Sequence, residues 1–130
     1  MKRALLAAMA ICGCADTHIM INRAYTTDGY TVKGIHGTYV WSEKKQRASL
    51  TTGEGFEARV YTDRDGDGAA DEVLYQYETF TRDQAGTSEM FRRADEDMDL
   101  ARARYDIPGL HAEWKAMTPD ERARREDYFK

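Results

Sequence analysis

Residues 63–71 alternate aspartate with small residues in a pattern that could bind a cation. Side chains at alternating positions of a tight loop can turn toward a common centre, and Gly68 permits the sharp bend that such a loop needs. Carboxylate and carbonyl oxygens are the ligands that a hard cation such as calcium prefers. We therefore predict a calcium site in this loop. The predicted ligands are the side chains of Asp63, Asp65, Asp67 and Asp71 and the backbone carbonyl of Ala69.

The charge of this loop supports the same prediction. Arg64 is the one basic residue among its aspartates, so the carboxylates repel one another when no cation is present. A divalent ion would remove that repulsion and fix the loop. The alternative is an acidic, glycine-rich hairpin turn that binds no metal.

The pattern D-x-D-x-D-G-x-x-D resembles the calcium loops of EF-hands, dockerins, thrombospondin type 3 repeats and integrin-type FG-GAP repeats. It departs from the EF-hand at the twelfth position, where Leu74 replaces the bidentate glutamate, and its flanks are strand-like. The FG-GAP resemblance implies a strand-loop-strand unit between residues 56–61 and 73–80. The single copy excludes a propeller. Such loops often bind calcium at roughly 10⁻⁴ to 10⁻³ M, which suits an extracellular setting.

The N-terminal residues have the features of an export signal. Lys2 and Arg3 are followed by an uninterrupted apolar run over residues 4–11. The run is too short to span a bilayer as a helix, which takes about 20 apolar residues. It does match the apolar region of a secretory signal peptide.

Residues 11–14, Ile-Cys-Gly-Cys, resemble the lipobox of bacterial lipoproteins. The resemblance implies that a signal peptide of residues 1–13 is removed, that Cys14 takes a diacylglycerol, and that its new amino group is acylated, for example with palmitate. Ala15 follows the cysteine where an aspartate would favour the inner membrane, so the outer membrane is favoured. The alternatives are an ordinary cleaved signal and a buried N-terminal helix.

Length and composition predict one domain after this leader. With 130 residues and 42% hydrophobic content, the chain has enough apolar residues for one modest core. We assign residues 14–18 to a short tether and residues 19–130 to a single domain. The net charge of −4 disfavours nucleic acid as a partner. Both cysteines, Cys12 and Cys14, lie in or next to the leader, so no disulfide can hold the domain together.

We predict an α+β fold in which a small antiparallel sheet of four to five strands precedes two to three C-terminal helices. Aromatic and β-branched residues dominate the chain up to about Thr81, and charged residues dominate it afterwards. Short turns at residues 26–29 and 52–55 leave no room for helical crossovers. The predicted strands are residues 19–25, 30–41 with a bend at Gly34 or Gly37, 47–51, 56–61 and 73–80.

The helical half follows from apolar spacing and capping signals. Residues 88–107 carry a stripe at intervals of three and four that should pack on the sheet. Pro108 and Gly109 should end this helix, before a short apolar turn. Thr118 and Glu121 form a capping box around Pro119, which predicts a last helix with a charged, mostly solvated face. The stripe consists of Phe91, Ala94, Met98, Ala101 and Tyr105, and the apolar turn carries Leu110, Trp114 and Met117.

Catalytic signatures are weak. His18, His36 and His111 are scattered, without a metalloprotease or nucleophile motif, and a core or surface role is expected for each. Several aromatic residues could line a carbohydrate or peptide groove, although core packing explains them equally well. The aromatic residues in question are Tyr39, Trp41, Tyr75 and Tyr77.

These features favour a non-enzymatic envelope lipoprotein, held to a membrane by its lipid, in which a calcium-stabilised hairpin supports a structural or binding role. The partner would be an envelope protein or a glycan. The alternatives are a calcium-dependent envelope hydrolase, whose acidic loop supplies metal and general base, and an inhibitor or assembly factor for another envelope protein.

Overall fold

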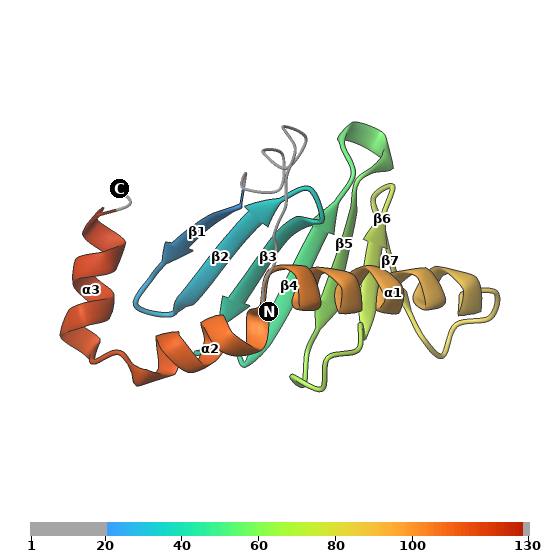
Figure 1. Ribbon diagram of the computed structural model, residues 1–130. Coiled ribbons are helices and arrows are strands. Elements are labelled where there is room, and N and C mark those ends of the chain that lie inside the picture. The colour runs from blue at the N-terminus through green and yellow to red at the C-terminus, as the bar shows by residue number, and fades with distance from the viewer. Residues whose placement is uncertain (1–20, 129–130) are drawn as a thin grey trace, which may run out of the picture.

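The computed structural model describes residues 21–128, which form one antiparallel sheet followed by three helices (Figure 1). The seven strands are hydrogen-bonded in chain order, each to the next. The α+β prediction is confirmed, but the predicted number of four to five strands is wrong. The strands are β1 (Asn22–Tyr25), β2 (Gly29–Gly34), β3 (Gly37–Ser42), β4 (Arg47–Thr52), β5 (Arg59–Asp63), β6 (Glu72–Tyr75) and β7 (Glu78–Thr81), with a short 3-10 helix, η2 (Gly55–Glu57), before β5.

The two extra strands arise because two predicted strands are hairpins. Within residues 30–41, Gly34 pairs with Gly37 at a tight turn between β2 and β3. Gly37 has a φ of +102°, which favours glycine. Within residues 73–80, Gln76 and Tyr77 form the turn between β6 and β7 with φ values of 51° and 69°. A two-residue turn with both φ values positive is a favoured hairpin connection, and it usually contains Asn or Gly. Because neither residue is present here, the sequence did not indicate the turn.

The predicted strand at residues 56–61 is also corrected. Its first part is η2, and β5 begins only at Arg59. Tyr61 therefore points into the core, whereas Phe56 is 60% exposed. Asp63, two residues after Tyr61 on the same strand, lies on the same inward face and is buried. The corrected register thus gives the acidic loop one buried carboxylate.

Two helices, α1 (Ser88–Arg104) and α2 (Ile107–Ala116), cover one face of the sheet, and α3 (Pro119–Tyr128) lies beside its β1 edge (Figure 1). The apolar stripe of α1 is buried as predicted, although the helix ends at Arg104 rather than at residue 107. The capping box of α3 is confirmed, since Thr118 N donates to Glu121 Oε1 at 3.0 Å and Glu121 N donates to Thr118 Oγ1 at 3.1 Å. None of the helices within residues 21–128 is long and apolar enough to cross a bilayer.

The α2 helix corrects the prediction that Pro108 and Gly109 begin an apolar turn. Both residues lie in its first turn, where proline is tolerated because its missing N–H would have no helical partner. Asp106 caps this helix by accepting the Gly109 amide at 3.3 Å. Trp114, fully buried, donates from Nε1 to the Thr26 carbonyl at 2.9 Å and ties α2 to the turn between β1 and β2.

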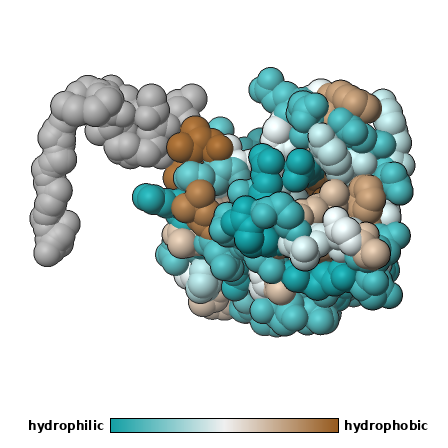
Figure 2. All heavy atoms as spheres, turned by 90° about the vertical axis from the view of Figure 1, so that its right-hand side faces the viewer, coloured by the Kyte–Doolittle hydropathy of each residue, from teal (hydrophilic) through white to brown (hydrophobic). Residues whose placement is uncertain are grey.

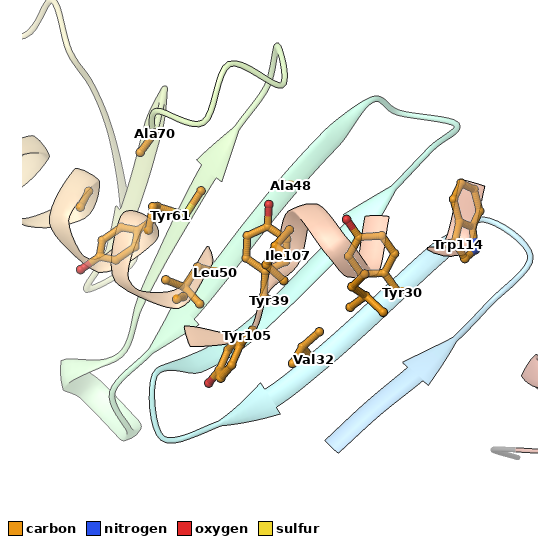
Figure 3. Packing of buried hydrophobic residues seen from close by; sticks show 14 of the residues in the cluster. Tyr30, Val32, Tyr39, Ala48, Leu50, Tyr61, Ala70, Tyr105, Ile107 and Trp114 are labelled. Atoms are coloured by element: carbon orange, nitrogen blue, oxygen red, sulfur yellow. The ribbon is translucent and has the colours of Figure 1, made fainter. Parts of the chain in front are cut away.

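Aromatic side chains fill the space between the sheet and the helices. Figure 3 shows Tyr30, Tyr39 and Tyr61 on the inner face of the sheet, with Leu50 between Tyr39 and Tyr61. Tyr39 therefore belongs to the core, whereas Tyr77 is 93% exposed at its turn. The surface at the β7 edge is largely hydrophilic, with apolar residues scattered among polar ones (Figure 2). Polar side chains on an edge strand discourage pairing with other chains.

Candidate metal centre

The loop between β5 and β6 brings together the four aspartates that the sequence predicts as ligands. Each offers a carboxylate oxygen, and these oxygens all lie within 4.8 Å of one another. The loop connects two paired antiparallel strands, with Thr62 opposite Glu72 at its base. The four side chains of this aspartate cluster are Asp63, Asp65, Asp67 and Asp71.

Asp63 organises the loop from its base. Its Oδ1 accepts the amide of Gly66 at 2.9 Å, and its Oδ2 accepts the amide of Gly68 at 2.7 Å. Gly66 and Gly68 have φ values of +77° and +92°, a backbone conformation that residues other than glycine rarely adopt. The two glycines therefore let the chain curl around one carboxylate.

The remaining aspartates each use one oxygen to hold the backbone. Asp65 Oδ1 accepts the amide of Asp67 at 3.2 Å, and Asp67 Oδ1 accepts the amide of Ala69 at 2.9 Å. Asp71 Oδ2 accepts the amide of Arg64 at 2.7 Å. The second oxygen of each carboxylate stays available to a cation. The Ala69 carbonyl remains a predicted ligand, because no contact identifies it as one.

The electrostatic environment differs within the cluster. Asp63 is only 1% exposed, and burial raises its pKa despite the amides that it accepts. The neighbouring Asp65 and Asp67 carboxylates raise the Asp63 pKa further. Asp65 is exposed, and the hydrogen bond from the Asp67 amide lowers its pKa. A buried carboxylate beside like charges is costly to ionise, and a bound cation would remove that cost.

Two residues outside the loop, Arg82 and Asp95, hold its C-terminal end in place. No pattern in the sequence indicates this role. Arg82 donates from Nε to the Ala70 carbonyl at 2.7 Å and pairs with Asp95 of α1 at 2.5 Å. Asp95 also accepts the Ala70 amide at 3.3 Å. Ala70 itself is fully buried. This network fixes the C-terminal end of the loop against α1.

The histidines of the described residues do not join the aspartate cluster. The backbone amide of His36 donates to the Tyr105 hydroxyl at 2.9 Å, at the turn between β2 and β3. His111, on α2, has its Nδ1 2.9 Å from the Tyr30 hydroxyl, and burial lowers its pKa. His18 and the predicted lipidation site Cys14 lie outside the described residues. The aspartate cluster is an arrangement that could hold a cation.

No protein-family model, curated protein or solved structure matches this chain.

Proposed function

We propose that the loop at residues 63–71 binds one calcium ion, which stabilises the hairpin of β5 and β6. The observation that carries the proposal is the convergence of four carboxylates, one of them buried, within 4.8 Å. Backbone amides already orient each carboxylate, so little rearrangement is needed before a cation binds. The ligands are Asp63, Asp65, Asp67 and Asp71, joined by the carbonyl of Ala69.

The ligand types and the flexible loop favour calcium over magnesium. The carboxylate oxygens all lie within 4.8 Å of one another, a spacing that one cation can bridge. Calcium accepts six to eight oxygens in irregular geometry, whereas magnesium requires a near-octahedral site and usually keeps several of its waters.

We further propose that the chain is a lipid-anchored protein of the bacterial envelope, with Cys14 as the lipidated residue. The order of basic residues, apolar run and lipobox supports this location, and Ala15 favours the outer membrane. An exported protein also meets calcium at concentrations that a weak loop can bind. The calcium-stabilised hairpin then serves a structural or binding role at the membrane.

Thermal unfolding tests the calcium proposal. Calcium should raise the unfolding temperature of the wild-type chain, and magnesium should raise it less. The double variant Asp65→Ala, Asp67→Ala should lose the increment, because it removes two of the predicted ligand side chains. Glu54→Gln, an exposed acid outside the loop, should retain it. An equal increment in the wild-type chain and the double variant would contradict the proposal.

Metabolic labelling with a fatty-acid analogue tests the location. The wild-type chain should incorporate the label and fractionate with membranes. Cys14→Ser should lose both properties, whereas Cys12→Ser should keep them. Label that persists in Cys14→Ser would contradict the lipid anchor.

A further inference from the structure

A cavity of about 330 Å³ lies beside the loop, where α1 and α2 meet the inner face of the sheet. Its volume is within the range of sites that bind small molecules. Strand residues form its floor, Arg102 of α1 and His111 of α2 form its sides, and Asp63 and Gly66 reach it from the loop. The aromatic floor residues are Tyr30, Tyr39 and Trp41.

Arg102 is the one permanent cation among the residues that line this cavity. It donates from Nη1 to the Tyr39 hydroxyl at 3.1 Å. Within residues 21–128 it forms no ion pair with a carboxylate. A guanidinium has five N–H donors in a planar fork, so most of its donors remain for a ligand. Such a fork matches a carboxylate, which it can bind through two parallel hydrogen bonds.

The walls of the cavity suit a flat ring. Trp41 and His111 meet edge to face, with ring centroids 5.1 Å apart and an angle of 84° between the planes. Tyr30 fixes His111 through the 2.9 Å hydrogen bond to Nδ1. Because burial lowers the pKa of His111, the imidazole is neutral near pH 7 and presents a polarisable ring surface rather than a second charge.

We propose that this cavity binds a carboxylate carried on a six-membered ring, with Arg102 contacting the carboxylate and the ring packing against the surface that Trp41 and His111 form together. Both an aromatic acid and an acidic sugar have this chemistry. Asp63 does not oppose the anion strongly, because both of its oxygens accept amides of its own loop. This proposal does not depend on calcium.

A second part of the proposal rests on the calcium function proposed above. A Cβ atom at Gly68 would lie 4.0 Å from Arg102 Nε, so the guanidinium lies directly beside the loop. In the metal-free protein the negative charge of the loop would oppose an anion bound at Arg102. Calcium would offset that charge. Calcium should therefore strengthen carboxylate binding by about fivefold, and the carboxylate should strengthen calcium binding equally.

Binding of two charged probes and their neutral analogues tests the cavity. Benzoate and D-glucuronate represent the two sources of the carboxylate, and benzamide and D-glucose are the neutral controls. The full chain should bind at least one charged probe in EDTA with a dissociation constant on the order of 1 mM. Amide and indole NMR signals should shift at Trp41 and around His111. Binding of benzoate alone indicates an aromatic acid, and binding of D-glucuronate alone indicates an acidic sugar.

Substitution of the arginine provides the control. Arg102→Met keeps the aliphatic stem and should weaken binding at least tenfold, whereas Arg104→Met, exposed on the same helix, should leave binding unchanged. Tyr39→Phe removes the hydroxyl partner without removing core volume and should weaken binding a few-fold. The proposal would be overturned if the neutral analogues bound as tightly as the acids, or if no probe bound. It would also be overturned if the NMR shifts were confined to other surfaces, or if Arg102→Met bound the acids as tightly as the wild-type chain. Loss of the calcium dependence alone would overturn only its second part.

Discussion

Two acidic turns lie at the same end of the sheet, and their carboxylates have different partners. The first, here called the lysine-paired turn, comprises residues 43–46 between β3 and β4 together with Asp28, which lies in the turn between β1 and β2. Asp28 accepts the Ser42 hydroxyl at 2.5 Å and the Lys44 amide at 2.7 Å. Glu43 pairs with Lys115 of α2 at 2.8 Å. The protein itself thus supplies the positive charge that this turn needs.

The loop at residues 63–71 has no such compensation. Its only basic residue, Arg64, pairs with Glu72 at 2.8 Å and with none of the four aspartates among the described residues. The aspartates accept backbone amides and face one another instead. Acid-rich turns are common without metal, so composition alone does not identify a cation site. Within residues 21–128 no lysine or arginine forms an ion pair with these aspartates, and this distinguishes the loop from the lysine-paired turn.

The pKa of the buried aspartate of the loop shifts in the opposite direction from the pKa values of the lysine-paired turn, whereas the exposed Asp65 has a lowered pKa. Hydrogen bonds from Ser42 and Lys115 hold the pKa values of Asp28 and Glu43 below their usual range. Burial raises the pKa of Asp63. Ionisation of Asp28 and Glu43 therefore favours folding, whereas ionisation of Asp63 in the metal-free protein opposes it.

The largest expected effect is the calcium increment in stability. At a calcium concentration 100 times the dissociation constant, the free energy of unfolding should rise by about 2.7 kcal/mol. Asp28→Asn should show the same increment, because the lysine-paired turn needs no metal. Urea unfolding of both proteins, with calcium and with EDTA, measures this. A smaller increment in Asp28→Asn than in the wild-type chain would break the comparison.

Backbone conformation should produce the next largest effect. Gly66→Ala should lower the free energy of unfolding by about 1 to 2 kcal/mol, because Gly66 has a φ of +77° and no neighbouring atom within 4 Å that a methyl group could contact favourably. The same substitution should weaken calcium binding, since the Gly66 amide orients Asp63. Urea unfolding and calcium titration check the two effects. Unchanged stability would show that the loop is not held in this conformation.

Without calcium, neutralising one acid in each turn should change the free energy of unfolding in opposite directions. Asp67→Asn relieves repulsion in the loop and should raise the free energy of unfolding by a few tenths of a kcal/mol. Glu43→Gln removes the ion pair with Lys115 and should lower the free energy of unfolding by roughly 0.5 kcal/mol. Thermal unfolding in EDTA compares them. Destabilisation of similar size in both variants would mean that the loop is already compensated.

The smallest effects should appear in the titration of single carboxylates. In EDTA, NMR should show Asp63 titrating above 3.8 and Asp28 below 3.8, the model-compound value for aspartate. As the pH falls, the stability from Asp28 is lost through its lowered pKa, whereas protonation relieves the buried Asp63. Calcium should move the Asp63 titration to lower pH. The reverse order of the two aspartates would contradict the electrostatic contrast.

Local sequence signals predicted several elements correctly. The apolar stripe of α1, the capping box at Thr118 and the spacing of the aspartates each depend on neighbours within one turn or loop, so the chain itself carries the information. The first helix ends before Pro108, as predicted, but the apolar turn predicted after it is a second helix, because Asp106 provides a cap. The turn at Gln76 and Tyr77 has no glycine or asparagine and gave no signal.

The features that the sequence did not predict depend on contacts between distant segments. Arg82 and Asp95 support the loop through Ala70, and Arg102 reaches the cavity only because α1 crosses the sheet. Each of these residues is one of many charged side chains in the C-terminal half. Their roles follow from tertiary structure, which spacing along the chain does not encode.

Calorimetric titration with calcium tests the central claim most directly. The wild-type chain and the double variant Asp28→Asn, Glu43→Gln should each bind one calcium ion with similar affinity, and Asp65→Ala, Asp67→Ala should bind none at the same concentrations. Binding that survives in Asp65→Ala, Asp67→Ala, or that disappears in Asp28→Asn, Glu43→Gln, would contradict the calcium site at residues 63–71.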